Sequence, residues 1–508
     1  MGSGTFRGGI RPYDGKDLSR DRAIQDIRPG KELAYLVSQH IGAPAKPIVK
    51  KGDRVLVGQM IAEAGGFVSA PVYASVSGVV KGIEKRLTAT GGYCDAIIVE
   101  NDEVYESVAF EETKDITQLS KDEIRGKIQK AGIVGMGGAG FPTHVKLTPK
   151  EPEKIKYILV NGAECEPYLT SDYRIMLEQP EKLVGGLKVM LQLFDGAKGY
   201  ICIENNKPEG IAKLQELVEG EANIEVQPLK TKYPQGAERM LIYAVTGETI
   251  NSSMLPADAG CIVDNVDTVV SIYEAVAEGK PLMQRIVTVT GDGVNTPSNF
   301  RAPVGMDFQE LLDAAGGLKG TVEKVISGGP MMGFAMFDYH VPVTKTTSAL
   351  LVLTKDEVRR SRATACINCG RCVSECPEHL LPTKLATFAE HRKEEAFVKY
   401  NGMECCECGC CSYVCPAKRP LVQEIRSMRK MVMANRKKKS EGDVKYGRVI
   451  TCILIAAYPF KSDHRLSYEN GNRGSDAGNS GRCVFLWMEG TAAGLSVSGN
   501  LCGDRGNL

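Results

Sequence analysis

Two short cysteine-rich stretches stand out among the residues that can do chemistry. In "CINCGRCVSECP" the spacing C-x2-C-x2-C-x3-C-P places Cys366, Cys369, Cys372 and Cys376. In "CCECGCCSYVCP" the same spacing recurs at Cys405, Cys408, Cys411 and Cys415. Ten of the 17 cysteines lie between Cys366 and Cys415. Cysteines that cluster in one short part of a long chain indicate metal binding in a reducing compartment rather than a disulfide scaffold.

This spacing is typical of thiolates that bind [4Fe–4S] clusters. In bacterial proteins with two such clusters, three cysteines of one run hold a cluster and the fourth reaches the other cluster. We therefore expect one cluster on Cys366, Cys369, Cys372 and Cys415, and a second on Cys405, Cys408, Cys411 and Cys376. We also expect each fourth cysteine to open a helix. A zinc ribbon would pair two C-x2-C knuckles, which fits a fourfold spacing repeated twice less well.

Two further cysteines, Cys406 and Cys410, fall outside the spacing. They are most simply interpreted as spare thiols, with a role as alternative ligands as the lesser possibility. Gly370 and Gly409 are small enough to let backbone N–H groups approach cluster sulfurs and tune the potential. Because a module with two such clusters only moves single electrons, the rest of the chain must supply their source or sink.

A glycine-rich stretch, "GIVGMGGAGFPTHVKL", contains G-x-G-x-x-G at Gly135, Gly137 and Gly140. A Rossmann fold requires a strand directly before such a loop, but "DEIRGKIQKAG" predicts a helix there, so we do not expect that fold. The N–H groups of the loop and the start of a following helix can still hold a phosphate. We expect His144, within this stretch, to be a surface residue.

The composition is that of an ordinary soluble protein. With 508 residues, 43% hydrophobic and 25% charged, the chain should form about three or four domains. Its net charge of +1 argues against nucleic acid as a partner. The opening residues have no apolar segment typical of a secretory signal, and Val449 to Phe460 is too short to span a bilayer. We therefore expect a soluble chain that can dock on a membrane complex.

The pattern along the chain predicts a multidomain α/β and α+β protein. Residues 1–118 alternate short strands and turns, which predicts a small β domain similar to the barrel-sandwich of biotinyl and lipoyl carriers, without their modified lysine. Residues 119–284 alternate strands and helices in an α/β layer, beginning with a capping box at Ser120 and Glu123. Residues 285–345 predict a compact ubiquitin-sized unit, 355–439 the α-helical cysteine module, and 446–508 a disordered tail.

The end of the cysteine module, "PLVQEIRSMRKMVMANRKKK" from Pro420 to Lys439, predicts a basic helix. One side of it is apolar and carries Leu421, Ile425, Met428 and Val432. The charged side fits an anionic lipid surface or an acidic subunit, but a solvated helix face is the favoured interpretation.

Three motifs resemble the FMN- and NADH-binding subunit of respiratory complex I: "GMGGAGFPTHVK", "NGAECEPYLTSDYR" and "YPQGAE". In that family these segments surround FMN and admit NADH over its ring. The resemblance implies that Gly135, Gly137, Gly138, Gly140 and Lys146 line the flavin or nucleotide phosphates. It also implies a polar wall of Asn161, Glu164 and Glu166, a place beside nicotinamide and isoalloxazine for Tyr233, Gly236 and Glu238, and an FMN contact from Asn265.

The chain departs from that pattern at three positions. Val134 stands where an arginine is expected just before the glycine loop, and Ala163 and Ala237 stand where acidic residues are expected. These differences bear on the nucleotide contacts more than on the flavin site.

The order of the parts resembles the RnfC family, whose members each form one subunit of an Rnf complex. That family joins a barrel-sandwich domain, a flavin/NADH-binding domain, an SLBB-like β-grasp domain and a ferredoxin-like domain with two [4Fe–4S] clusters. "TFRGGI", "QHIGAPAKPIVKKGD" and "GFVSAPVYASVSG" also look like that family, and the resemblance covers roughly Thr5 to Lys439.

The resemblance implies a peripheral subunit on the cytoplasmic side of the cell membrane, in an ion-translocating ferredoxin:NAD+ oxidoreductase. Its partners would be the other Rnf subunits, both integral membrane and ferredoxin-like, with ferredoxin reached indirectly. Two [4Fe–4S] clusters, FMN and NAD(H) would carry the redox chemistry, so we expect no catalytic side chain. Two alternatives stay open: a soluble flavin/iron–sulfur reductase similar to cobalamin reductases, and a relay scaffold that binds clusters but no nucleotide.

Overall fold

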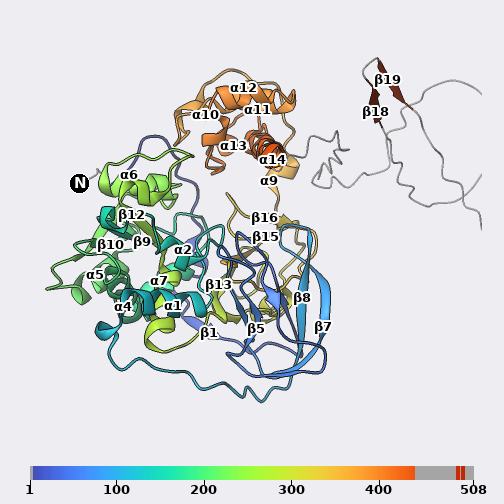
Figure 1. The fold of residues 1–508 in the computed structure, drawn as a ribbon. Coiled ribbons are helices and arrows are strands. Elements are labelled where there is room, and N and C mark those ends of the chain that lie inside the picture. The colour runs from blue at the N-terminus through green and yellow to red at the C-terminus, as the bar shows by residue number, and fades with distance from the viewer. Residues whose placement is uncertain (1–3, 441–487, 492–493, 498–508) are drawn as a thin grey trace, which may run out of the picture. The chain divides into compact units, whose positions relative to one another are not determined.

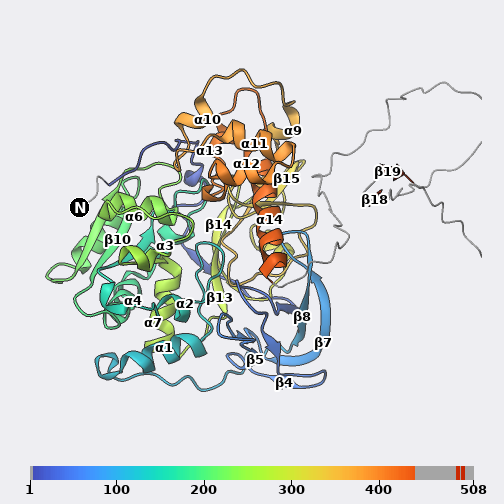
Figure 2. The ribbon, with the colours of Figure 1, turned by 45° about the horizontal axis from the view of Figure 1, so that its top comes forward.

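The computed structural model describes residues 4–440, 488–491 and 494–497. The chain divides into two compact units, residues 1–443 and 444–508. In the second unit β18 (Met488–Thr491) and β19 (Gly494–Val497) pair in antiparallel fashion. The rest of the tail predicted for residues 446–508 lies outside the described residues. Figures 1 and 2 show the first unit from two directions.

The N-terminal part forms two small antiparallel sheets that share one core. One has the order β2 (Glu32–Leu36), β8 (Tyr93–Asn101), β7 (Gly78–Leu87) and β4 (Arg54–Val55). The other has the order β3 (Lys46–Pro47), β5 (Met60–Glu63) and β6 (Val72–Tyr73). Alternate residues such as Ile97 and Val99 are fully buried between the sheets. This is the barrel-sandwich arrangement that the sequence predicts.

The next region is a layered α/β domain built on a parallel sheet. The strand order is β11 (Ile224–Leu229), β10 (Lys198–Glu204), β9 (Tyr157–Gly162) and β12 (Cys261–Asn265). Ile158 and Val160 face one core, and Leu159 between them faces the other. Helices α4 (Pro180–Leu191), α5 (Pro208–Leu217) and α7 (Val266–Ala277) cover the first face, and α6 (Glu238–Thr246) covers the second.

The connections of this sheet create a crevice at its carboxyl edge. From β9 the chain moves outward through β10 and β11 and then returns to β12 on the other side of β9. Ligands of open α/β sheets bind at such a switch point, outside the carboxyl ends of the strands. The glycine loop follows helix α1 (Lys121–Lys130), which begins with the predicted capping box of Ser120 and Glu123, and it leads into α2 (Thr143–Lys146). A helix rather than a strand thus precedes the loop, as predicted.

The third domain is a mixed sheet that recruits strands from outside the predicted stretch. Its order is β1 (Ile24–Asp26), β14 (Ser298–Pro303), β13 (Gln284–Thr290), β17 (Ala349–Leu353), β15 (Lys324–Ser327) and β16 (Phe334–Met336). Helix α8 (Phe308–Ala314) buries Phe308, Leu311 and Leu312 in its core. Strand β1 comes from the N-terminal segment and pairs with the edge of β14, which leaves that edge covered.

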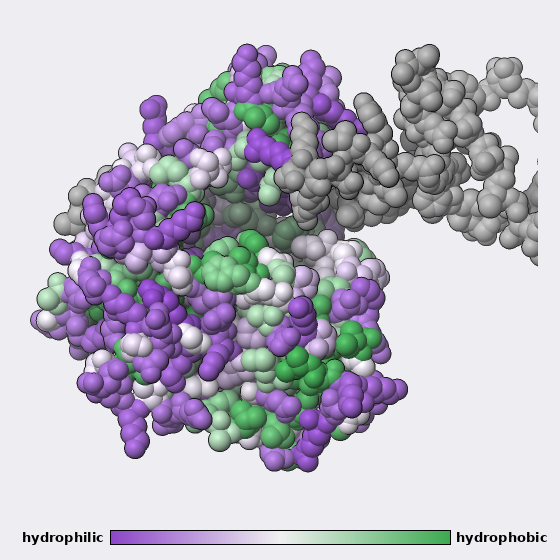
Figure 3. All heavy atoms as spheres, in the orientation of Figure 1, coloured by the Kyte–Doolittle hydropathy of each residue, from purple (hydrophilic) through white to green (hydrophobic). Residues whose placement is uncertain are grey.

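The cysteine module is helical and lies above this sheet in Figure 1. Its helices are α9 (Glu357–Arg360), α10 (Arg371–Ser374), α11 (Pro382–Glu390), α12 (Glu394–Lys399), α13 (Cys410–Tyr413) and α14 (Leu421–Ser440). The apolar side predicted for α14 is buried, since Leu421, Ile425, Met428 and Val432 are each at most 2% exposed. Figure 3 shows a recess between this module and the domains below it. Among the described helices, none has the length and hydropathy needed to cross a membrane.

Candidate functional site

The two cysteine motifs adopt the same backbone conformation. Asn368 and Glu407, at matching positions, have left-handed φ values of 55° and 59°. Gly370 and Gly409, directly after the second cysteine of each motif, have φ values of 75° and 80°. Because left-handed residues reverse the chain tightly, each motif curls around its own cysteines. The sequence repeat is therefore a structural repeat as well.

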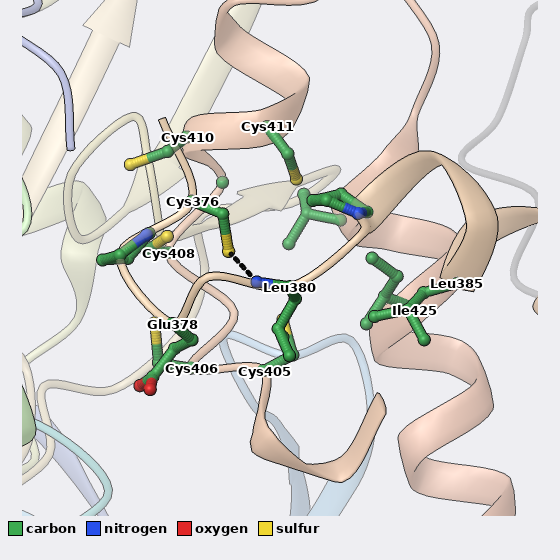
Figure 4. A pocket seen from close by; sticks show the side chains of 14 residues that line it. Cys376, Glu378, Leu380, Leu385, Cys405, Cys406, Cys408, Cys410, Cys411 and Ile425 are labelled. Carbon is green, nitrogen blue, oxygen red and sulfur yellow. Dashed lines mark hydrogen bonds between the residues drawn. The ribbon is translucent and has the colours of Figure 1, made fainter. Parts of the chain in front are cut away.

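This curling turns backbone N–H groups toward sulfur atoms. The N–H of Asn368 donates to Cys366 Sγ, and the N–H of Glu407 donates to Cys405 Sγ, each at 3.4 Å. The N–H of Leu380 donates to Cys376 Sγ at the same distance, as Figure 4 shows. Such bonds stabilise cluster thiolates and tune their potential, so these loops fit an iron–sulfur cluster.

The cysteines surround two pockets. Cys366, Cys369, Cys372 and Cys415 line an outer pocket of about 550 Å³. Cys376, Cys405, Cys408 and Cys411 line an inner pocket of about 340 Å³, together with Cys406 and Cys410 (Figure 4). The fourth cysteine of each motif thus lies with the first three of the other, which is the grouping we predict for ligation. Within the described residues, no group of three or more His, Cys, Asp or Glu side chains is close enough together to hold a single metal ion. The cysteines instead surround the two pockets.

One detail of the motif prediction is wrong. Cys376 and Cys415 do not open helices; they follow the short helices α10 and α13. The next helices begin only at Pro382 and Leu421. The reason is the proline after each cysteine, because a residue that precedes proline is disfavoured in the helical region.

The two pockets differ in their exposure. Cys366 and Cys369 of the outer pocket are exposed, whereas Cys376, Cys408 and Cys411 of the inner pocket are buried. Burial raises the pKa of the Cys411 thiol to about 12, so as a free thiol it keeps its proton at neutral pH. Metal ligation of the inner cysteines must therefore release protons.

The inner pocket lies against the domain of the parallel sheet. The Tyr233 hydroxyl donates to the Cys408 carbonyl at 2.8 Å, and Tyr233 is itself only 2% exposed. The N-terminal segment fills the junction, since Ile10 pairs with Tyr233 and the N–H of Gly9 donates to the Glu375 carbonyl at 2.9 Å. A residue of the "YPQGAE" motif thus contacts a predicted cluster loop directly.

At the carboxyl edge of the sheet the glycine loop meets two asparagines. Asn161 is a partly exposed residue next to the end of β9, and Asn265, its neighbour in register on β12, caps helix α7. A Cβ on Gly137 would lie 2.9 Å from Asn265 Cβ, so the loop packs closely here and glycine is required. A Cβ on Gly138, in contrast, would meet no described atom within 4 Å. The exposed loop, both asparagines and the start of α7 therefore frame one open site at the switch point.

Several of the buried polar atoms that lack a hydrogen-bond partner belong to segments around this site. Among the described residues, Thr143 Oγ1, Asp264 Oδ2 and both amide atoms of Gln235 have no hydrogen-bond partner, and Glu164 Oε2 has only an ion pair with Lys16 Nζ at 3.6 Å. Leaving such atoms unsatisfied is unfavourable, so native proteins usually provide a partner from protein, water or ligand. The residues therefore fit a ligand with many hydrogen-bonding groups, as a flavin nucleotide is.

Several residues implied in flavin or nucleotide contacts are placed in protein contacts. Glu164 Oε1 accepts from the N–H of Asp172 at 2.7 Å, at the start of α3 (Ser171–Glu178). Glu166 Oε1 accepts from the N–H groups of Met331 and Met332 at 2.8 and 3.0 Å, in the hairpin before β16. Their roles toward a nucleotide stay predictions.

Lys146, Gly236 and Glu238 lie near the same edge. Lys146 Nζ donates to Val263 O and to Asp264 Oδ1, at 2.6 and 3.0 Å, on strand β12. The carbonyl of Gly236 accepts from Asn161 Nδ2 at 2.8 Å, and Glu238 begins α6. His144 is not a surface residue, so that expectation is wrong. It is 6% exposed because the Phe67 loop of the first domain covers it, with Nε2 3.2 Å from Phe67 O.

Asp172 belongs to this site although sequence reasoning missed it. Its Oδ2 accepts from Asn265 Nδ2 at 2.7 Å, across 93 positions of sequence. Burial, together with the neighbouring Glu164 and Asp267 carboxylates, raises the pKa of Asp172 to about 7. Asp172 lies in the "NGAECEPYLTSDYR" motif. An acidic side chain within that motif was the signal in the sequence that could have placed it at the site.

The family profiles that match the chain follow the observed domains. They are described as the RnfC barrel sandwich hybrid domain (residues 4–104), the Nuo51 FMN-binding domain (128–274), the SLBB domain (286–335) and the 4Fe-4S dicluster domain (365–418). The fold and its two sites thus define an electron-transfer protein of the iron–sulfur flavoprotein class.

Relatives extend this match over most of the chain. The RnfC subunit of the proton-translocating ferredoxin:NAD(+) oxidoreductase complex of Clostridium ljungdahlii is 43% identical over 428 residues, 84% of this chain and 93% of the relative. The RnfC subunit of the Na(+)-translocating ferredoxin:NAD(+) oxidoreductase complex of Acetobacterium woodii is 42% identical over 436 residues, 86% of this chain and 98% of the relative. The chain belongs to the RnfC family, which confirms the resemblance seen in its motifs.

Proposed function

We propose that this chain is the NAD(H)-reacting subunit of an ion-translocating ferredoxin:NAD+ oxidoreductase, bound peripherally on the cytoplasmic side of the membrane. It exchanges single electrons with partner subunits and paired electrons with NAD(H). The activity named for the relatives from C. ljungdahlii and A. woodii supports this proposal.

The observation that carries the proposal is the bond between the flavin-type motif and the inner cysteine pocket. The Tyr233 hydroxyl donates to the Cys408 carbonyl at 2.8 Å, so a flavin at the sheet edge and a cluster in the inner pocket would lie in one compact unit with a direct contact between their binding segments. FMN, when bound, converts between hydride transfer and single-electron transfer, which neither a nicotinamide nor a cluster does alone. The protein's own part is to hold and orient these groups.

Three domains close the space between the two sites. Ile10, Tyr233, Cys408 and Cys410 form a buried apolar group there, with Met331 packed against it. The Met331 carbonyl lies 3.2 Å from the position of a Cβ on Gly409, and Glu166 fixes this hairpin through the N–H of Met331. Close packing of this kind excludes water from the route between flavin and cluster.

The outer pocket suits electron exchange with partner subunits. Cys366 and Cys369 are exposed, and Ile367 between them is 66% exposed, so a partner can approach this loop closely. We infer the order partner subunit, outer cluster, inner cluster, flavin and NAD(H), which is reversible. The cysteine assignments are Cys366, Cys369, Cys372 and Cys415 for the outer cluster, and Cys376, Cys405, Cys408 and Cys411 for the inner one.

A substitution in the glycine loop tests the flavin site. Gly138→Ala adds a methyl group that meets no described atom, so the fold should keep its melting temperature and iron content. FMN binding should weaken at least about tenfold, or about 1.4 kcal/mol, because the methyl group enters the space assigned to the flavin. Anaerobic titration with FMN, followed by NADH, measures both binding and reduction of the clusters.

The matched control is Gly126→Ala, which also adds a methyl group without contacts but lies in helix α1. It should bind FMN like the unchanged chain. If Gly138→Ala binds FMN equally well, the flavin does not lie on this loop. If NADH fails to reduce the clusters of the FMN-loaded chain, the proposed function is wrong.

A further inference from the structure

Arg285 is a buried arginine that belongs to one domain and bonds to another. It lies on β13 of the mixed sheet and is 3% exposed. Its Nε donates to the Thr347 carbonyl at 3.1 Å, within its own domain. Its other two nitrogens contact the domain of the parallel sheet. Nη1 forms an ion pair with Asp267, and Nη2 donates to the Met136 carbonyl at 3.4 Å.

The two distant partners of Arg285 belong to the two halves of the open site. Met136 stands in the glycine loop between Gly135 and Gly137, and its N–H donates to Thr268 Oγ1 at 3.0 Å. Asp267 lies in the first turn of α7, where its N–H donates to the side chain of the cap residue Asn265. Arg285 therefore contacts both the glycine loop and the start of α7, and it links these two elements.

The charge of Arg285 matters because acidic groups crowd this site. The Asp267 side chain is 10% exposed and lies at the helix start that would face a phosphate. Asp172 and Glu164 also lie close by, although Glu164 is paired with Lys16, whose Nζ lies 3.6 Å from Glu164 Oε2. Without Arg285, the Asp267 carboxylate would be an unpaired buried charge that repels a phosphate. The residue before the glycine loop does not supply a cation, since it is Val134.

We propose that Arg285 is a positioning residue of the flavin phosphate cradle, supplied by the mixed-sheet domain. It holds the glycine loop against α7 and neutralises Asp267, so that the N–H groups of both elements face the phosphate without opposing charge. This inference rests on the proposed function of the glycine loop and extends it to a residue outside the flavin-type domain.

The comparison of FMN with riboflavin isolates this effect, because riboflavin lacks the phosphate. In the full-length chain with its clusters assembled, Arg285→Met should weaken FMN binding at least about tenfold, equal to about 1.4 kcal/mol. Riboflavin binding should change much less. The double variant Arg285→Met/Asp267→Asn removes the unpaired carboxylate and should recover most of the FMN affinity. Arg285→Lys keeps the charge, so it should keep the preference for FMN over riboflavin.

The control is Arg301→Met, which removes an arginine of the neighbouring strand β14 that pairs with Asp26 at the surface. It should leave both affinities unchanged. Equal losses of FMN and riboflavin affinity in Arg285→Met, or no recovery in the double variant, would overturn the inference. If the unchanged chain does not prefer FMN to riboflavin, the phosphate assignment of the glycine loop fails instead, which separates the two proposals.

Discussion

Removing the hydroxyl of Tyr233, at the junction of the two sites, should change the reduction potential of the inner cluster and leave that of the outer cluster unchanged. In Tyr233→Phe the ring stays, but the hydrogen bond of 2.8 Å to the Cys408 carbonyl is lost. Among the described residues no other donor bonds to this carbonyl. The substitution therefore removes a positive hydrogen next to a predicted cluster ligand and leaves a buried acceptor unsatisfied.

The energy of the lost hydrogen bond sets the size of the expected shift in reduction potential. A hydrogen bond of this kind contributes about 1 kcal/mol, and an unsatisfied buried carbonyl costs about 1–3 kcal/mol. If about 1 kcal/mol of this distinguishes the two oxidation states, the one-electron potential falls by about 40 mV, since about 59 mV corresponds to a tenfold change. The sign is negative because the reduced cluster carries the additional negative charge, which the lost O–H dipole had stabilised.

The assay is an anaerobic redox titration of the assembled chain, followed by electron paramagnetic resonance. One of the two cluster signals should shift to a lower potential in Tyr233→Phe, and the other should not move. Tyr173→Phe is the control, because its hydroxyl donates to Glu209 at 3.2 Å, away from the cysteines. Equal shifts of both clusters, or none, would refute the reasoning that Tyr233 contacts the loop of one cluster only.

Two further predictions test the cysteine grouping and the acidic site. Cys415→Ser should remove the same cluster as Cys366→Ser and leave the same remaining spectrum, whereas a spectrum like that of Cys405→Ser would contradict the crosswise grouping. The pKa of Asp172 in the folded chain, about 7, lies above its ordinary value of 3.8, so the stability linked to its protonated form is lost as the pH rises from about 4 to about 7. Asp172→Asn should therefore gain melting temperature relative to the unchanged chain as the pH rises from about 4 to about 7, with no further gain above that, and a difference that does not vary with pH would contradict the assignment.

Local patterns predicted much of this fold because they are governed by local physics. The capping box at Ser120, the helix before the glycine loop and the apolar side of α14 each follow from side-chain spacing along one element. The placing of each fourth cysteine beside the other motif's pocket was also predictable, since two equal motifs constrain each other's geometry, while the cluster ligands themselves stay a prediction.

Contacts between domains were not predictable in the same way. Glu166 bonds to N–H groups 165 and 166 positions away, and Tyr233 to a carbonyl 175 positions away. No spacing within a motif encodes such partners, because they depend on how the domains pack. The contacts of Arg285 could not be predicted from the sequence for the same reason, because its partners Asp267 and Met136 belong to another domain.

We propose that one chain holds two [4Fe–4S] clusters and one flavin in neighbouring sites. Anaerobic reconstitution of the full-length chain, with iron, sulfide and flavin quantified, tests it most directly. We expect about eight iron atoms, about eight sulfides and about one FMN per chain, since each cluster contains four irons and four sulfides. About four iron atoms per chain, or no bound flavin, would contradict it.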